Sequence, residues 1–157
     1  MIPQLFIDTL RENGQSVSVA ESLTGGLLAS ALVDIPGASD VFLGGVVAYT
    51  IATKREVLGV SEDALTCGVV SQEVAIAMAK GALELFGSDY AISTTGVAGP
   101  GSQEGIEPGT VWLGCASKVL TGAVLIKLTG DRNQIRAAAV NAALELIDTQ
   151  EVFSRLR

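Results

Sequence analysis

Short apolar runs alternate with segments of helical pattern along most of this chain, and that alternation is the strongest constraint on its fold. Three apolar runs are typical of buried strands, and two further runs lie close enough together to form a hairpin. Strands separated by helices build parallel sheets, whereas a hairpin contributes antiparallel strands. The pattern therefore predicts an α/β fold, a three-layer α/β/α sandwich with a mixed sheet. The expected strands are 17–20, 41–50, 90–94, 110–117 and 120–128, and the expected helices are 2–13, 23–34, 52–58, 71–86 and 131–147, with another short helix starting near 61.

The length of 157 residues fits one domain spanning 1–157. Apolar residues make up 48% of the chain but aromatic residues only 4%, so the core must be built from Ala, Val, Leu and Ile. Gly44 and Gly45 interrupt the second expected strand and predict a bulge or a close backbone approach. Because few charges cover the surface, we expect a homodimer or a larger homo-oligomer. Phe153 could join such an interface or pack on its own domain.

The formal charge is −7 and the isoelectric point is near 4.5, which argues against binding to nucleic acid or to an anionic membrane. Cys67 and Cys115 show no metal-ligand spacing, and we expect both to be buried free thiols. Free thiols fit a reducing cytoplasm, which is the expected location. We expect no signal peptide at the amino terminus, and no apolar run reaches membrane-spanning length.

The chain contains no histidine, which narrows its possible chemistry. A Ser-His-Asp triad or a Cys-His pair cannot form within one chain, and histidine-based zinc sites are excluded too. If this protein is a hydrolase, its general base must be Lys, Asp, Glu or Tyr, or a metal-bound water held by carboxylates.

A candidate ligand site begins at Ser22, where the first expected strand gives way to a helix. Ser22 occupies the position of a helix N-cap, and the free N–H groups of the first turn would point towards the same place. Thr24, Gly25 and Gly26 follow, and glycines let an anion or an oxyanion approach closely. The alternative interpretation is a capped helix whose glycines serve close packing.

Two further segments carry groups that could act on a ligand. Gly37 and Ser39 lie on a loop of small residues before the second strand, although Ser39 could simply close a turn. Tyr49 ends that strand and Lys54 follows within two helical turns. In a chain without histidine, a lysine with a lowered pKa is the obvious base for a serine. The alternative is that Lys54 is a solvated helix residue.

A glycine-rich turn follows the strand that ends near Thr94, and it reads Thr95-Gly96-Val97-Ala98-Gly99-Pro100-Gly101. Its backbone N–H groups could bind a phosphate or an oxyanion. The turn matches neither GxxxxGK[ST] nor GxGxxG, so the nucleotide-binding fingerprints do not apply. Arg132 and Arg136 share a face of the last helix, and either could pair with a phosphate or remain a surface cation.

Taken together and in order, these segments resemble a known family. They read AESLTGG, DIPGASDVFLGGVVAY with Lys54, GVVSQEVA, STTGVAGP, GTVW and GDRNQIR. The chain resembles, from about Ile2 to Ile147, the C-terminal domain of the competence/damage-inducible protein (CinA) family, also known as the nicotinamide-nucleotide amidohydrolase (NMN deamidase, PncC-like) family. The segment after Gly99, 101–108, departs from the glycine-rich and Glu-rich continuation of the family.

The resemblance implies hydrolysis of nicotinamide mononucleotide (NMN) to nicotinate mononucleotide and ammonia, in bacterial pyridine-nucleotide recycling and without a metal or other cofactor. Some relatives carry an additional N-terminal molybdopterin-binding-like domain, and we expect this chain to correspond to the stand-alone form. The site residues that it implies are Ser22, Gly37, Ser39, Tyr49, Lys54, Thr95 and Arg136.

The mechanistic hypothesis takes Ser39 as nucleophile, Lys54 as base and Tyr49 as a proton relay, with Ser22 as the alternative nucleophile or a substrate ligand. Burial or the neighbouring Arg55 would lower the pKa of Lys54. Arg136 would neutralise the substrate phosphate, and backbone N–H groups near Thr24, Gly25, Thr95 and Gly96 would bind the phosphate or the oxyanion. Two alternatives remain: a non-catalytic nucleotide-binding or regulatory module of the same fold, and a hydrolase for another small amide or a phosphorylated nucleoside.

Overall fold

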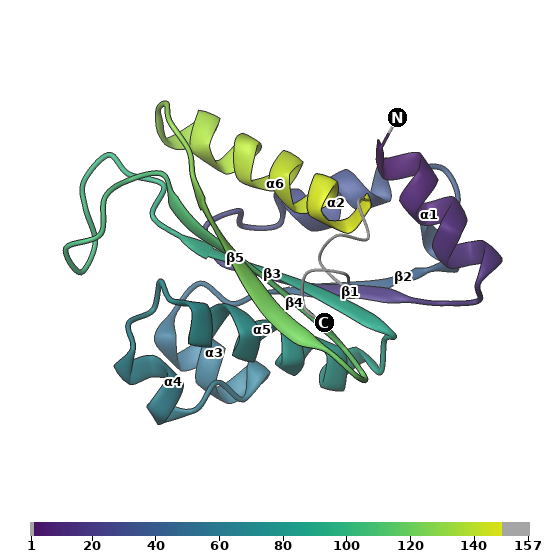
Figure 1. The fold of residues 1–157 in the computed structure, drawn as a ribbon, viewed down its shortest axis with the longest axis horizontal. Coiled ribbons are helices and arrows are strands. Elements are labelled where there is room, and N and C mark those ends of the chain that lie inside the picture. Colours follow the sequence, from purple (N-terminus) through teal and green to yellow (C-terminus); the bar gives the residue numbers. More distant parts are fainter. Residues whose placement is uncertain (1, 149–157) are drawn as a thin grey trace.

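A five-stranded mixed sheet forms the centre of the molecule in the computed structural model, which describes residues 2–148 (Figure 1). The strand order is β2-β1-β3-β4-β5. The first three strands in that order are parallel, and β4 and β5 pair antiparallel as a hairpin on the β3 side. The predicted mixed α/β sheet is confirmed. The strands are β1 (Val17–Glu21), β2 (Phe42–Val47), β3 (Tyr90–Gly96), β4 (Thr110–Ser117) and β5 (Thr121–Lys127).

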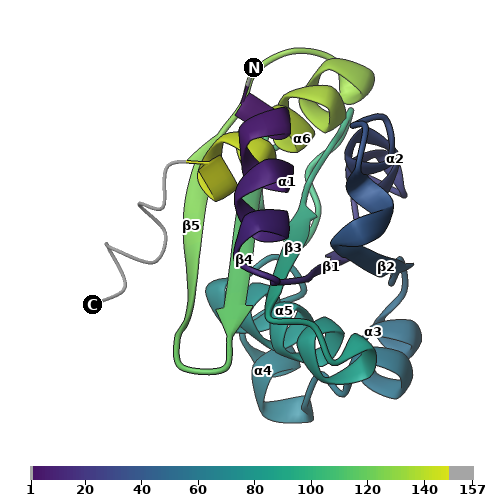
Figure 2. The same ribbon diagram turned by 90° about the vertical axis from the view of Figure 1, so that its right-hand side faces the viewer.

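Helices cover both faces of the sheet, as the views in Figures 1 and 2 show. One layer contains α1 (Ile2–Glu12), α2 (Leu27–Val33) and α6 (Arg132–Asp148). The opposite layer contains α3 (Ile51–Leu58), α4 (Glu62–Thr66) and α5 (Gln72–Phe86). A short 3₁₀ turn, Ala38–Asp40, precedes β2. This arrangement is the predicted three-layer sandwich.

Helix ends follow local capping chemistry at several positions. The hydroxyls of Thr50, Ser61 and Ser71 each accept a hydrogen bond from a first-turn N–H, at the starts of α3, α4 and α5. At α6, Asp131 and Gln134 bond each other's backbone N–H groups in a capping box. The cap at Thr50 also explains why β2 ends at Val47, earlier than predicted: the chain must leave the strand before the helix can start.

Two apolar clusters hold the layers together, one on each side of the sheet. The predicted bulge in β2 is present, because the pairing register with β1 shifts just before Gly44. On the other face, α3 packs closely on α5 at Gly81. A Cβ there would lie 2.1 Å from the carbonyl oxygen of Leu58, so only glycine permits this approach. That contact fixes the end of α3 against α5.

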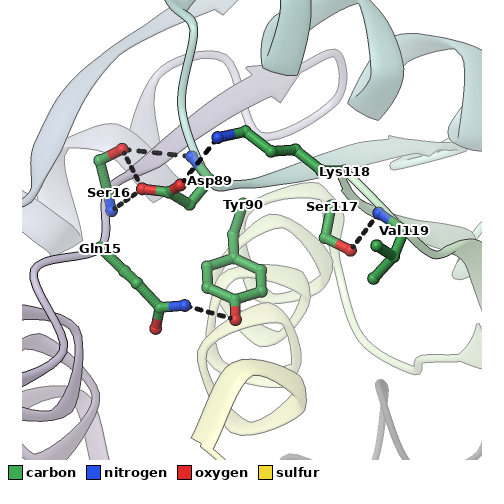
Figure 3. A network of polar contacts seen from close by, with 7 residues as sticks. All are labelled: Gln15, Ser16, Asp89, Tyr90, Ser117, Lys118 and Val119. Carbon is green, nitrogen blue, oxygen red and sulfur yellow. Dashed lines mark hydrogen bonds and ion pairs between the residues drawn. The ribbon is translucent and has the colours of Figure 1, made fainter.

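A polar network joins the strands at the end where β1 and β3 begin (Figure 3). Asp89 accepts hydrogen bonds from the backbone and the hydroxyl of Ser16, and it contacts the amine of Lys118 at 3.4 Å. The backbone N–H of Ser16 lowers the pKa of the Asp89 carboxyl. Gln15 donates to the Tyr90 hydroxyl beside this cluster. The network fixes the register of β1 against β3 at the end of the sheet opposite to the site described below.

Among residues 2–148, none of the helices combines the length and hydrophobicity needed to cross a membrane. Of the two cysteines, Cys115 is buried as predicted, whereas Cys67 is exposed at the end of α4. Burial raises the pKa of the Cys115 thiol to about 11. Phe153 lies outside the described residues.

Candidate functional site

A cavity of about 480 Å³ opens at the carboxyl ends of the parallel strands. Parallel α/β sheets bind ligands at this edge. The wall is built from five segments that are distant in sequence: the exit of β1, the β2–α3 turn with the first turn of α3, the segment before α5, the end of β3 with the loop after it, and the start of α6. In residues, these are 22–23, Tyr49 with Lys54, 69–70, 95–99 with 101–103, and Arg132.

Lys54 is the central residue of this cavity, and its side chain is only 1% exposed. Its Nζ donates one hydrogen bond to Ser22 Oγ at 2.8 Å and another to the carbonyl oxygen of Ala48, also at 2.8 Å. Burial lowers the pKa of Lys54 from 10.5 to about 8. Lys54 is therefore an amine that can be neutral near physiological pH and that already contacts a serine hydroxyl.

Burial, and not the neighbouring Arg55, is the cause of that lowered pKa. Arg55 lies on the exposed side of α3, where its guanidinium contacts Glu62 at 2.7 Å. Of the two causes proposed from sequence, the structure selects the first.

Ser22 lies directly after β1, and its backbone N–H still bonds to β3 through the Thr94 carbonyl at 2.9 Å. It does not cap α2, which begins at Leu27 and not at 23. The segment 24–26 forms a turn, and the residue before the helix, Gly26, has a φ of 101° that few other residues adopt. This corrects the predicted N-cap, and it leaves the Ser22 hydroxyl free to meet Lys54.

Glu21 caps α2 in place of Ser22, although the sequence reasoning did not single it out. Its carboxylate is 1% exposed and accepts bonds from the backbone N–H groups of Gly26, Leu28 and Ala29 at 2.9–3.1 Å. It also accepts the hydroxyl proton of Thr24 at 2.5 Å. The available signal was an acidic residue at the end of an apolar strand, shortly before a Thr-Gly-Gly turn.

Thr24 and Gly25 were predicted to bind substrate, but neither lines the cavity: Thr24 is buried, and Gly25 is exposed in the turn after Ser22. The Thr24 hydroxyl bonds to Glu21 and to Thr94, and Thr24 is fully buried. A Cβ on Gly25 would lie 3.2 Å from Nη2 of Arg136. Both residues belong to the turn that follows Ser22, outside the cavity lining.

The two arginines of α6 differ in what they contact. Arg136 donates from Nε to the Leu23 carbonyl at 2.8 Å and from Nη2 to the Thr24 carbonyl at 3.2 Å, so it holds the Ser22 segment in place. Arg132 lines the cavity. Arg136 was predicted to bind the phosphate, but it is Arg132, and not Arg136, that is among the residues lining the cavity.

Tyr49 also lines the cavity, and 59% of its surface is exposed. Its hydroxyl accepts a hydrogen bond from Arg132 Nη2 at 3.0 Å, while Arg132 Nη1 donates to the Gly99 carbonyl at 2.7 Å. The three residues join the β2–α3 turn, the glycine-rich loop and α6 at the cavity rim. The described contacts of Tyr49 therefore place its hydroxyl on Arg132, whereas the hypothesis of a proton relay requires contact with Lys54 or the nucleophile.

The end of β3 and the glycine-rich loop after it form one side of the cavity, and Thr95 and Gly96 at the strand end both line it. The Thr95 hydroxyl donates to the Val69 carbonyl at 2.9 Å, so it ties the end of β3 to the segment before α5. Glu104 makes a second tie, because its carboxylate accepts from the Val69 N–H at 3.2 Å. Of the predicted site residues, Ser22, Tyr49, Lys54, Thr95 and Gly96 therefore meet at one cavity.

Ser39 and Gly37 do not join them. Ser39 is exposed in the turn before β2, whereas Lys54 follows the other end of that strand. Six extended residues separate the two ends by roughly 20 Å. Gly37 packs against Arg11 of α1, since a Cβ there would lie 2.7 Å from the guanidinium. The pairing of Ser39 with Lys54 is corrected, and Ser22 takes the place of Ser39 beside the amine.

The arrangement places a hydroxyl, a buried amine and an arginine around one small-molecule cavity. A neutral lysine can remove the serine proton, and the serine oxygen can then attack an electrophilic carbon. No cluster of three or more His, Cys, Asp or Glu side chains suited to a metal ion occurs within the described part of the chain.

Comparison with protein families gives a match over residues 2–150 to the CinA C-terminal domain. The chain belongs to the CinA C-terminal domain family. Among its relatives, the CinA-like protein of Frankia casuarinae is 45% identical over 144 residues, which cover 91% of this chain but 33% of that protein. This CinA domain therefore spans about a third of the length of the curated relatives it matches.

Solved structures of CinA proteins share the fold. A CinA superfamily protein from Klebsiella pneumoniae superposes with a TM-score of 0.92 at 31% identity, covering 97% of this chain and 96% of that one. The competence/damage inducible protein CihA from Agrobacterium tumefaciens gives a TM-score of 0.88 at 37% identity, with 96% and 95% covered. The similarity extends over the whole α/β/α sandwich of the CinA domain.

Proposed function

We propose that this CinA domain is an amidohydrolase that converts nicotinamide mononucleotide and water to nicotinate mononucleotide and ammonia. The observation that carries the proposal is the 2.8 Å contact between Lys54 Nζ and Ser22 Oγ inside a cavity, in a chain that has no histidine. The cavity volume of about 480 Å³ lies within the range of about 300–1,000 Å³ typical of small-molecule sites.

In the first half of the reaction, neutral Lys54 takes the proton from Ser22, and Ser22 Oγ bonds to the carboxamide carbon. The resulting tetrahedral intermediate collapses when the Lys54 ammonium returns that proton to the amide nitrogen and the C–N bond breaks. Ammonia leaves, and the nicotinoyl group remains as an ester on Ser22.

In the second half, a water molecule takes the position of the ammonia. Lys54 removes a proton from that water, and the hydroxide attacks the ester carbon. Lys54 then returns the proton to Ser22 Oγ as the ester bond breaks, and nicotinate mononucleotide is released. Each proton is thus moved by the same amine, whose pKa of about 8 lets it act as both base and acid near neutral pH.

Substrate binding uses the opposite side of the cavity. Arg132 supplies the cation for the phosphate, and its contacts to Tyr49 and the Gly99 carbonyl fix its guanidinium at the rim. No carboxylate lines the cavity among the described residues. An anionic amide therefore meets no opposing negative charge there.

The test is ammonia release from NMN by the purified chain in the presence of a chelator, with Lys54→Ala measured beside it. We expect release by the wild type and at least a hundredfold slower release by the variant, because general-base catalysis contributes about 10²–10⁴-fold. Nicotinamide riboside, which lacks the phosphate, should be a much poorer substrate. NMN binding by a folded wild type without ammonia release would favour a non-catalytic nucleotide-binding module.

A further inference from the structure

Three buried side chains form a chain of hydrogen bonds behind Ser22, on the side away from the cavity. Glu21, Thr24 and Thr94 are each at most 1% exposed. Glu21 Oε2 lies 2.5 Å from Thr24 Oγ1, and Thr24 Oγ1 lies 2.7 Å from Thr94 Oγ1. The Ser22 N–H reaches the last member at 3.4 Å, in addition to its bond to the Thr94 carbonyl.

The direction of every proton in this chain follows from the carboxylate at its end. A carboxylate only accepts, so the Thr24 hydroxyl must donate to Glu21. The single hydroxyl proton of Thr24 is then already donated, so the hydroxyl of Thr94 must donate to Thr24 Oγ1. The free lone pairs of Thr94 Oγ1 are thereby directed to accept from the Ser22 N–H.

Ser22 is consequently held from two sides. The Glu21–Thr24–Thr94 hydrogen bonds fix its backbone against β3, and Arg136 binds the carbonyls of the two residues that follow it, Leu23 and Thr24. The three backbone N–H groups that Gly26, Leu28 and Ala29 donate to Glu21 at the start of α2 hold that carboxylate in place. The only described hydrogen-bond partner of the Ser22 hydroxyl is the amine of Lys54.

We propose that Glu21, Thr24 and Thr94 act as positioning residues, which hold Ser22 Oγ at attacking geometry beside Lys54. This inference rests on the function proposed above. Misplacing a reacting atom by about 1 Å can lower the rate about a hundredfold. Loss of these hydrogen bonds should therefore lower kcat more than it changes substrate affinity.

The test compares Thr24→Val with Thr24→Ser. Valine has nearly the same shape but no hydroxyl, and Glu21 keeps its three backbone donors, so the cap of α2 survives. We expect kcat for NMN to fall about 10- to 100-fold in Thr24→Val while KM stays within about twofold. Thr24→Ser keeps the hydroxyl and should restore kcat to within about threefold of the wild type.

Ser18→Ala is the matched control. Ser18 is a buried residue of β1 whose hydroxyl lies 2.7 Å from that of Ser88, at the other end of the strand. Its loss removes a similar buried hydroxyl pair and should lower Tm without lowering kcat. The proposal is overturned if Thr24→Val keeps the wild-type kcat, or if Ser18→Ala lowers kcat as much as Thr24→Val does.

A second measurement does not depend on NMN being the substrate. A fluorophosphonate probe reacts with activated serines, and peptide mapping by mass spectrometry gives its rate of attachment to Ser22. If the wild type is labelled at Ser22 but inert towards NMN, the proposed substrate fails, and slower labelling of Thr24→Val than of Thr24→Ser still supports positioning. Equal labelling rates refute positioning, and a wild type with neither activity nor label refutes both proposals.

Discussion

The buried amine of Lys54 should make the stability of the protein depend on pH in a way that one substitution removes. The pKa of Lys54 is about 8 in the folded protein, compared with 10.5 for a solvated lysine, because burial disfavours the charged form. Between these values the unfolded chain binds more protons than the folded one. The free energy of unfolding must therefore rise with pH across this window.

The magnitude follows from the shift. A difference of about 2.5 pKa units corresponds to about 3 kcal/mol over the whole window, and to about 2–3 kcal/mol between pH 7 and pH 10. Lys54→Met replaces the amine by an apolar side chain of similar length and removes this contribution. The loss of the bonds to Ser22 and Ala48 adds an offset that does not vary in the same way with pH.

The assay is urea unfolding of the wild type and Lys54→Met at intervals from pH 7 to pH 10. The stability of the wild type relative to the variant should increase by about 2–3 kcal/mol across that range, since other titrating groups cancel in the difference. Lys80→Met is the matched control, because Lys80 is exposed on α5 and its amine stays in water in both states. Parallel curves for the wild type and Lys54→Met would refute the argument from burial.

Three further predictions concern activity and packing. First, the kcat/KM for NMN should rise about tenfold from pH 7 to pH 9. A base with a pKa of about 8 is about one-tenth neutral at pH 7 and about nine-tenths neutral at pH 9. A flat pH profile, measured by ammonia release, would contradict a lysine base. Second, Arg132→Ala should raise the KM for NMN about 10- to 100-fold, because the loss of a charged hydrogen bond costs about 1.5–3 kcal/mol. Arg11→Ala on α1 is the control and should leave KM unchanged. An unchanged KM in Arg132→Ala would contradict a role of Arg132 in phosphate binding. Third, Gly81→Ala should lower both Tm and kcat, because the added Cβ would collide with the Leu58 carbonyl and displace α3, which carries Lys54. A variant whose Tm by circular dichroism and whose activity equal those of the wild type would show that the close contact is dispensable.

Most of the fold was predictable from the sequence, because the strand and helix boundaries depend on local apolar patterns and capping residues. The bounds of β4 match the prediction, and α5 ends at Phe86 as expected. The main error was the start of α2, where a serine after a strand looks like an N-cap. The neighbouring carboxylate, Glu21, performs the capping instead, and helical periodicity does not reveal which of the two side chains reaches the helix end.

For the site, the sequence indicated which segments take part, but not which of their side chains contact one another. The absence of histidine directed attention to Lys54, and the structure places it beside a serine. The choice between Ser22 and Ser39 needed the topology, since the two lie at opposite ends of parallel neighbours β1 and β2. The choice between Arg132 and Arg136 needed side-chain directions on one helix face, which spacing alone leaves open.

The central claim is that Ser22, and not Ser39, is the nucleophile activated by Lys54. Its most direct test is the initial rate of ammonia release from NMN by Ser22→Ala and Ser39→Ala, measured beside the wild type at pH 8 with folding checked by circular dichroism. We predict that Ser22→Ala loses at least a thousandfold in kcat, since loss of a nucleophile removes most of the catalysis, while Ser39→Ala stays within about twofold of the wild type. Substantial activity in Ser22→Ala, or its loss in Ser39→Ala, would contradict the account.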